Sequence, residues 1–355
     1  MYCKIFFNEN QKIMAQEKYK VCVRCFTYNQ AHYIEDTLNG FCMQETSFPY
    51  VAVIMDDASS DGEQGVIRDY FDRNFCHSDD KYSRQEETED YVLTFARHKT
   101  NRNCFFAVFY LKYNHWGKKK KGPYAAEWFD NTDYIAICEG DDFWTDSCKL
   151  QKEADVLDAN PDVSMVYTAF NTIGANGEVI NRPKYNRFIK RSYTGNILPE
   201  LFYSNFILTL TIMLRRDVLY SDLYLNSPNK YDYTTFFSAA FLGRCYFLPD
   251  ITGCYRKNEG SCITAHFDEV EQGLFKVYLY FVDIFLIGVN AIQFSFHDTI
   301  SIYRNILVNL FFHDNYQYIK RVIGKNVLSC LLIPEAYVFS LLKKLKRKTY
   351  GSIDR

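Results

Sequence analysis

The sequence predicts an α/β fold in which helices cover both faces of a mostly parallel central sheet. Continuous apolar runs of strand length, such as residues 51–55 and 134–138, are typical of strands buried in a parallel sheet. Segments with helical spacing alternate with these runs, as they do in β-α-β units. Two of the runs end in carboxylates, and neither a dinucleotide-binding G-x-G-x-x-G string nor a phosphate-loop string occurs. The carboxylates are therefore the candidates for ligand binding.

The expected elements follow in a regular order. A first strand at 21–27 leads through a turn at 28–30 to a helix at 33–42, and a second strand at 51–55 leads through an acidic loop at 56–62 to a helix at 64–75. We expect a loop at 76–90, a weaker strand at 91–96 and a helix at 105–111. A basic run at 118–121 precedes the strand at 134–138, a helix at 147–159 and a strand at 164–169.

The four residues Glu139-Gly140-Asp141-Asp142 are the most informative stretch of the chain, because they place three carboxylates at the end of an apolar strand. Such a cluster is costly, since like charges repel one another and burial favours protonation. A divalent cation removes that cost, and oxygen ligands suit Mg²⁺ or Mn²⁺ together with substrate phosphate. In open α/β sheets, ligands bind at the carboxyl ends of strands. The stretch predicts a metal–phosphate site, and a solvated acidic loop is the alternative.

Composition bounds the class of protein. With 355 residues, 48% of them apolar and 24% charged, the chain is globular and long enough for one large domain or two ordinary ones. The net charge of −2 gives no reason to expect nucleic acid as a partner. The twelve cysteines lack paired metal spacing, and Cys22 and Cys25 would face opposite sides of a strand. Free thiols in a reducing cytoplasm are the expected state.

Two features concern membranes. The late uncharged stretch, residues 284–296, is too short to span a bilayer. Residues 331–348 combine leucines with a run of Lys and Arg, which is typical either of a solvated terminal helix or of a basic amphipathic helix on an anionic membrane surface. No secretory signal is visible, so we expect a cytoplasmic protein, with peripheral contact at the inner face of the membrane as an open alternative.

Three stretches together resemble family 2 glycosyltransferases of the GT-A fold. Residues 21–29 resemble the opening strand and its turn, residues 54–62 resemble the V-D-D-x-S-x-D-G motif, and residues 134–150 resemble the D-x-D region. The last stretch is similar to the form found in bacterial enzymes of surface-polysaccharide assembly. The resemblance implies an N-terminal extension (1–18), a GT-A domain (19–265) and a helical C-terminal region (266–355). Within the domain, residues 19–145 would bind the nucleotide and residues 146–265 the acceptor.

The resemblance also implies roles for individual residues. Asp141 would be the main metal ligand, and Asp57 would accept a hydrogen bond from a uracil ring. Other residues would lie around the donor: Thr27 and Tyr28 at the base, Asp56 beside Asp57, Glu139 at the ribose or a metal-bound water, Asp142 behind the metal, and Arg256 at the diphosphate. A capped turn before a helix is the alternative reading of the 56–62 loop.

Asp232 is the expected catalytic base. It lies in Tyr231-Asp232-Tyr233, which resembles the family's [GE]-D-[WY] stretch at the start of a helix. The alternative is an acidic residue that merely favours the helix dipole. Residues 255–261, with Ser261, resemble a later Y-R-x-H-x-x-S segment whose histidine is replaced by Asn258. Trp144 could pack beneath the acid cluster or stack on a sugar.

These residues imply an inverting, hexosyltransferase-type enzyme of polysaccharide synthesis. It would move a sugar from a nucleotide-sugar donor, most simply a UDP-sugar, to a hydroxyl of a glycan or lipid-linked glycan acceptor, with Mn²⁺ or Mg²⁺ as cofactor. Two other classes stay open at this point. One is a nucleotidyltransferase that makes the activated sugar, and the other is a nucleotide- or glycan-binding module without chemistry.

Overall fold

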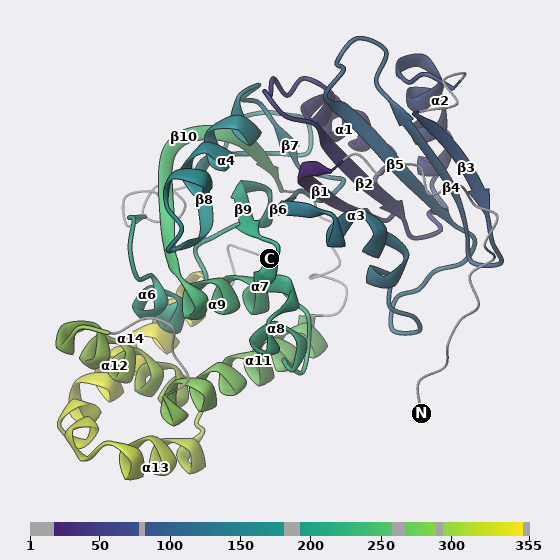
Figure 1. The fold of residues 1–355 in the computed structure, drawn as a ribbon. Helices are drawn as coiled ribbons and strands as arrows, with labels where there is room; N and C mark the ends of the chain where they lie inside the picture. The colour runs from purple at the N-terminus through teal and green to yellow at the C-terminus, as the bar shows by residue number, and fades with distance from the viewer. Residues whose placement is uncertain (1–17, 78–81, 181–191, 258–266, 289–293, 351–355) are drawn as a thin grey trace, which may run out of the picture.

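The computed structural model describes residues 18–77, 82–180, 192–257, 267–288 and 294–350. Most of the expected N-terminal extension, Ser261 and Asn258 lie outside these ranges. The described strands form one ten-stranded sheet in the order β3-β4-β5-β2-β1-β6-β9-β8-β10-β7 (Figure 1). The predicted α/β class is confirmed: helices flank a large central sheet, and further helices follow it at the C-terminal end.

The strands divide into a parallel centre and antiparallel margins. β5, β2, β1 and β6 run parallel, β9 runs against its neighbours β6 and β8, and β3 and β4 form an antiparallel edge. The bounds are β1 (Tyr19–Thr27), β2 (Tyr50–Asp56), β3 (Ser83–Glu87), β4 (Tyr91–Arg97), β5 (Cys104–Leu111), β6 (Thr132–Ile137), β7 (Phe143–Trp144), β8 (Val163–Ile173), β9 (Ile212–Arg215) and β10 (Arg244–Arg256).

The helices cover both faces of this sheet. Their bounds are α1 (Ile34–Cys42), α2 (Glu63–Asn74), α3 (Ala126–Asp130), α4 (Lys149–Ala159), α6 (Leu198–Tyr203), α7 (Asp217–Tyr220), α8 (Asp222–Leu225) and α9 (Asp232–Leu242). Single 3-10 turns lie at η1 (Gly122–Ala125) and η2 (Thr209–Thr211). Buried side chains of α1, α2 and α4 form one core, and those of α3, α6, α7 and α9 form the other. Cys22 belongs to one core and Cys25 to the other, which confirms the predicted opposite orientations.

Two sequence-based expectations are corrected. Residues 105–111 were expected to be helical but form β5, in which every side chain is buried; a short run of aromatic and apolar residues suits a strand enclosed on both faces. The expected loop at 76–90 contains β3, a polar strand at the sheet edge, where no apolar alternation marks it. The strands expected at 164–169 and 91–96 are confirmed, although the first extends to Ile173 and the second runs antiparallel to its neighbours.

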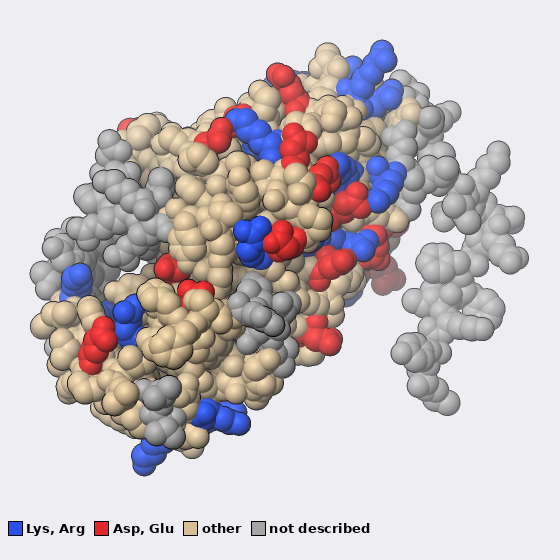
Figure 2. Space-filling view, turned by 60° about the vertical axis from the view of Figure 1, so that its left-hand side comes forward, with Lys and Arg blue, Asp and Glu red and all other residues tan. Residues whose placement is uncertain are grey.

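A helical region follows the sheet: α11 (Phe267–Ile287), α12 (Phe296–Phe312), α13 (Tyr316–Lys325), η3 (Val327–Leu332) and α14 (Ile333–Tyr350). Within the described residues, none of the helices combines the length and the apolarity that a membrane crossing requires. Figure 2 shows acidic and basic side chains interspersed over the face it displays, so neither sign of charge dominates that face.

Candidate functional site

The carboxyl ends of three neighbouring parallel strands meet at one edge of the sheet. β1 ends at Thr27, β2 at Asp56, and β6 leads directly into Glu139. β1 lies between the other two, so the chain leaves it toward β2 on one side and returns on the other side at β6. A crevice opens at such a switch point in α/β sheets and is where ligands bind. The sheet topology therefore brings the two predicted acidic loops together.

The loop after β2 is held by hydrogen bonds to its own carboxylates. Both oxygens of the buried Asp57 have partners: Oδ1 accepts the backbone N–H of His115 at 2.7 Å, and Oδ2 pairs with Nζ of Lys121 at 2.9 Å. The same Lys121 ammonium lies 5.3 Å from the Phe26 ring centroid. The three preceding lysines of the basic run are exposed, whereas Lys121 is half-buried against the site.

Asp56 is also buried, and its two oxygens differ. Oδ1 accepts the N–H of Ser59 at 3.0 Å and Nε2 of Gln64 at 2.6 Å. Oδ2 is buried without a hydrogen-bond donor among the described residues. A buried carboxylate oxygen without a partner is rare, because it loses its hydration and receives nothing in return. Asp56 therefore keeps an unused acceptor beside Asp57.

Glu63 is a buried residue that the sequence reasoning missed. Its carboxylate accepts hydrogen bonds from the hydroxyl of Thr27, the N–H of Gln30 at 2.9 Å and the hydroxyl of Ser59 at 2.8 Å. Burial raises the pKa of Glu63 to about 7, although these hydrogen bonds act in the opposite direction. Thr27 is thus bound to the protein through its side chain, while Tyr28 is exposed on the turn. In the sequence, Glu63 is an acidic residue at the start of a polar helix, which is too common a pattern to indicate a buried site residue.

The loop after β6 packs tightly against the end of β1. A Cβ atom at Gly140 would lie 2.0 Å from Oγ1 of Thr27, so only glycine fits at this position. The Thr37 hydroxyl of α1 lies within hydrogen-bonding distance of the carbonyls of Gly140 and Asp142. Beneath the loop, Trp144 is buried and its indole N–H donates to the Leu210 carbonyl at 2.9 Å. Trp144 therefore packs in the core rather than offering a face to a sugar.

The three carboxylates of this loop have different surroundings. Asp142 is buried, and its Oδ1 accepts the backbone N–H of Arg256 at 2.8 Å. Glu139 is half-buried and accepts the Thr209 hydroxyl at 2.6 Å. Burial, with a smaller contribution from the Asp232 charge, raises the pKa of Glu139 to about 7. Asp141 is half-buried at the tip of the loop and adds to the negative potential at both of its neighbours.

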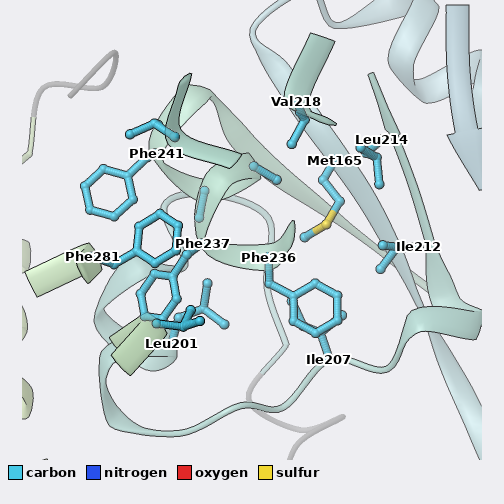
Figure 3. Close-up of a cluster of buried hydrophobic side chains, with 14 of the residues drawn as sticks. Met165, Leu201, Ile207, Ile212, Leu214, Val218, Phe236, Phe237, Phe241 and Phe281 are labelled. Atoms are coloured by element: carbon cyan, nitrogen blue, oxygen red, sulfur yellow. The ribbon is translucent and has the colours of Figure 1, made fainter. Parts of the chain in front are cut away.

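Asp232 is the first residue of α9, as the sequence predicted. Its side chain is exposed, yet desolvation by the surrounding protein raises its pKa. Figure 3 shows how the helix is held: Phe236 points toward Ile207 and Met165, while Phe237 lies with Phe281 of α11. The Phe237 and Phe281 ring centroids are 4.8 Å apart. This packing on two sides holds Asp232 close enough to Glu139 for their charges to interact.

Arg24, in the middle of β1, was also missed. Its positive charge lowers the pKa of both Glu139 and Asp232, against the larger effect of burial. The guanidinium lies 5.3 Å from the Phe26 ring centroid, so that Phe26 has cations from Arg24 and Lys121 near its ring. The sequence did offer a signal for Arg24, because it is the single charged residue within the apolar run 21–27. A charged residue is rarely placed in a buried strand unless it is paired.

Arg256 binds protein groups in this structure. Its Nε donates to the Asp141 carbonyl at 3.1 Å, and its Nη2 pairs with Oδ2 of Asp36 on α1 at 2.8 Å. The guanidinium lies 4.5 Å from the Tyr33 ring centroid and 5.4 Å from that of Phe143. The side chain is buried and links β10 to the backbone of the acidic loop. Its expected contact with a diphosphate would require these bonds to be exchanged.

The residues fit a metal ion that is completed by substrate. Among the described residues, no three His, Cys, Asp or Glu side chains are grouped to hold a metal by themselves. Mg²⁺ commonly takes one or two protein carboxylates and fills its shell with water and phosphate oxygens. Asp141 provides one such carboxylate beside Glu139, whose pKa burial raises to about 7. The arrangement suits a cation that arrives together with an anionic ligand.

A cavity of about 500 Å³ lies on the α1 side of the acidic loop. Its lining includes His32, Tyr33, Asp36, Phe143, Asn176 and Arg256. None of Asp57, Asp141 and Asp232 lines it. The cavity therefore does not include the predicted site carboxylates, although Arg256 both lines the cavity and contacts the Asp141 backbone.

No protein-family model matches the chain. Two mycobacterial proteins are 27% identical to it over 233 residues: Rv1520 of Mycobacterium tuberculosis (strain ATCC 25618 / H37Rv) and Mb1547 of Mycobacterium bovis, both described as uncharacterized. The match covers 65% of this chain and 57% of either relative, so the chain spans little more than half of their length.

The solved structure of S. aureus TarS shares the fold. S. aureus TarS is 17% identical, with a TM-score of 0.51 over 82% of this chain and 43% of TarS. The mannosyltransferase PcManGT from Pyrobaculum calidifontis, solved with GDP-Man and Mn²⁺, is 13% identical, with a TM-score of 0.44 over 92% of this chain and 87% of that chain. The likeness to TarS concerns the arrangement of the sheet and its helices.

Proposed function

We propose that the protein is a metal-assisted glycosyltransferase that moves a sugar from a nucleotide-sugar donor to an acceptor hydroxyl with inversion. The observation that carries the proposal is the meeting of Glu139 and Asp232 beside Asp141, at the carboxyl ends of parallel strands. The motif resemblance of residues 21–29, 54–62 and 134–150 supports the same reaction class. The resemblance also motivates a glycan acceptor and a GT-A domain over residues 19–265.

The donor base would bind at the loop after β2. Asp57 would accept a hydrogen bond from a base N–H, the base would lie against Tyr28, and the unused Oδ2 of Asp56 would provide a second acceptor. Because Lys121 occupies one oxygen of Asp57, binding requires that ammonium to move or to contact the donor phosphates itself. A uracil ring offers the N–H that this pairing needs, so a UDP-sugar is the proposed donor.

The diphosphate would lie toward Asp141, with Mn²⁺ or Mg²⁺ held between that carboxylate and phosphate oxygens. When bound, the cation would supply positive charge to stabilise the leaving diphosphate. Glu139 would lie next to it, where a cation favours the ionised carboxylate. Arg256 would hold the Asp141 backbone in place through its Nε hydrogen bond.

Asp232 would accept the proton of the acceptor hydroxyl. A carboxylate with a raised pKa is a stronger base than an ordinary one. Arg24 would limit how far that pKa rises. Attack by the acceptor on the side of the sugar opposite the diphosphate would give inversion.

A screen of nucleotide sugars by thermal shift, with and without Mn²⁺, tests the proposal. A ligand that binds the folded state raises the apparent melting temperature, so a UDP-sugar should stabilise the protein more with Mn²⁺ than without it. Donor hydrolysis, assayed without acceptor, then separates the alternatives. A glycosyltransferase releases UDP slowly, a nucleotidyltransferase requires a nucleoside triphosphate and the sugar phosphate, and a binding module releases nothing.

A further inference from the structure

The last helix of the described chain carries apolar side chains on the face turned away from the protein. α14 packs on α12 through Ala336 and Ser340, which are buried, and through Lys343. Lys343 donates to Oδ1 of Asn309 at 2.6 Å, and burial lowers its pKa to about 8. These three positions are four and three residues apart, so they form one stripe along the helix. That stripe defines the inner side of α14.

The opposite side of α14 is apolar and exposed. Val338, Leu341, Leu342 and Leu345 follow one another at the i, i+3, i+4 and i+7 spacing of a single helix face. Val338 is 55% exposed, Leu342 48% and Leu345 59%, and Leu331, one turn before the helix, is 77% exposed. We call these five residues the outer apolar face. Single exposed leucines are common, whereas a contiguous exposed row of them marks an interaction site.

The charge of α14 distinguishes between a second copy of the chain and a lipid surface as the partner of the outer apolar face. Residues 333–350 contain five cations and one acid, Glu335, which gives a net charge of +4 in a chain whose total is −2. Lys344 pairs with Asp314 at 2.8 Å, while Lys346 is exposed and Arg347 and Lys348 follow on the same helix. A second copy of this helix would bring like charges together. An apolar row beside clustered cations instead matches an anionic lipid surface, where the leucines enter the acyl boundary and the cations meet headgroups.

We propose that the outer apolar face of α14 docks the protein onto anionic lipid membranes, with the helix lying in the plane of the surface. Membrane attraction adds about 1 kcal/mol per Lys or Arg near the surface, and the buried leucines add a term that is insensitive to salt. The two contributions can therefore be separated by ionic strength. This docking does not depend on the proposed transfer reaction, since it requires neither donor nor metal.

Flotation with vesicles tests the proposal on the full chain. The protein should float with vesicles of phosphatidylcholine and phosphatidylglycerol and much less with phosphatidylcholine alone. Leu342→Asp should weaken that binding about tenfold or more, because it removes a buried leucine and adds a repelled charge. Lys346→Glu should weaken binding at low salt and less so at 0.5 M salt, where surface charges are screened.

Leu225→Asp is the matched control. Leu225 ends α8, is 54% exposed and lies outside the outer apolar face, so the same change there should leave vesicle binding unaltered. Circular dichroism and melting temperature should show that all three variants fold. Failure of the wild-type chain to float would overturn the proposal, as would equal binding by Leu342→Asp and Leu225→Asp. A concentration-dependent dimer that Leu342→Asp abolishes, without vesicle binding, would instead assign the face to a second copy.

Discussion

The loops after β2 and after β6 face each other across the end of β1, and they hold their carboxylates in different ways. In the β2 loop, both oxygens of Asp57 and both oxygens of Glu63 accept hydrogen bonds from nearby protein groups. In the β6 loop, Glu139 lies near Asp232 and Asp141, and Arg24 is the cation that lowers the pKa values of Glu139 and Asp232. The carboxylates of one loop are held in place by several protein donors, whereas Glu139 of the other lies close to two further carboxylates.

This difference indicates that the carboxylates of the two loops have different roles. A carboxylate that accepts several protein donors fixes the shape of a loop, since leaving any of those donors unpaired costs about 1–3 kcal/mol. A group of nearby carboxylates with little compensation is poised for a cation. Substitutions in the β6 loop and at Asp232 should therefore lower the reaction rate and spare the fold. Substitutions in the β2 loop should alter stability more than chemistry.

Asp141→Asn should have the largest effect. Removing the proposed metal ligand should cost several kcal/mol of transition-state stabilisation, which is about 10⁴-fold in rate. The half-buried side chain should tolerate an isosteric amide, so the melting temperature without ligand should change little. Mn²⁺-dependent turnover of a UDP-sugar measures the effect, and Asp133→Asn, at the exposed start of the same strand, is the control. Normal turnover in Asp141→Asn would remove the basis for a metal at this loop.

Asp232→Asn should come next, with a loss of about 10³-fold in kcat, within the range that general base catalysis contributes. UDP affinity should stay unchanged, because the residue would contact the acceptor rather than the nucleotide. Calorimetric titration with UDP and Mn²⁺, beside a transfer assay, separates the two quantities. Loss of nucleotide binding would show that Asp232 has another role.

The sequence predicted the two acidic loops and the strands that carry them in outline. Apolar runs identified β1, β2 and β6, and the carboxylates at their ends identified both loops. Both signals are visible in short stretches of consecutive residues. It did not predict β5, since a short apolar run suits a buried helix as well as a buried strand. Glu63 and Arg24 were missed because each acts on residues from other segments of the chain: Glu63 on Thr27, and Arg24 on Glu139 and Asp232.

Arg256 also shows what the sequence cannot predict, namely which group a charged side chain binds. The sequence suggested a cation for the diphosphate, whereas the observed guanidinium is bonded to Asp36 and to the Asp141 carbonyl. Residue type predicts that a charge will be satisfied, but the choice of partner depends on the tertiary fold. The same holds for Lys121, one of four consecutive lysines, which alone reaches Asp57.

Arg256→Ala tests whether the β6 loop depends on the hydrogen bonds of Arg256 to Asp36 and to the Asp141 carbonyl. The KM for the donor in the presence of Mn²⁺ should rise about tenfold, because one hydrogen bond to a charged group contributes about 1.5 kcal/mol. Arg256→Lys should rescue poorly, since an ammonium lacks the planar fork that reaches both Asp36 and the loop carbonyl. Arg244→Ala, at the exposed start of the same strand, is the matched control. Full rescue by lysine would favour direct contact with phosphate instead.

Glu63→Gln should have the smallest effect and should appear in stability rather than rate. Burial raises the pKa of the folded Glu63 from 4.5 to about 7, so its contribution to stability is fully present below about pH 4.5 and is lost as the pH rises through 7. Between pH 5 and 8 the wild type should therefore lose on the order of 1–3 kcal/mol more than the variant with the neutral amide. Urea unfolding at pH 5, 6.5 and 8 measures the two slopes, with the exposed Glu35→Gln as control. Equal slopes would mean that the hydrogen bonds from Thr27, Gln30 and Ser59 outweigh burial and keep Glu63 ionised, which would leave the β2 loop with one more negative charge than the raised pKa implies.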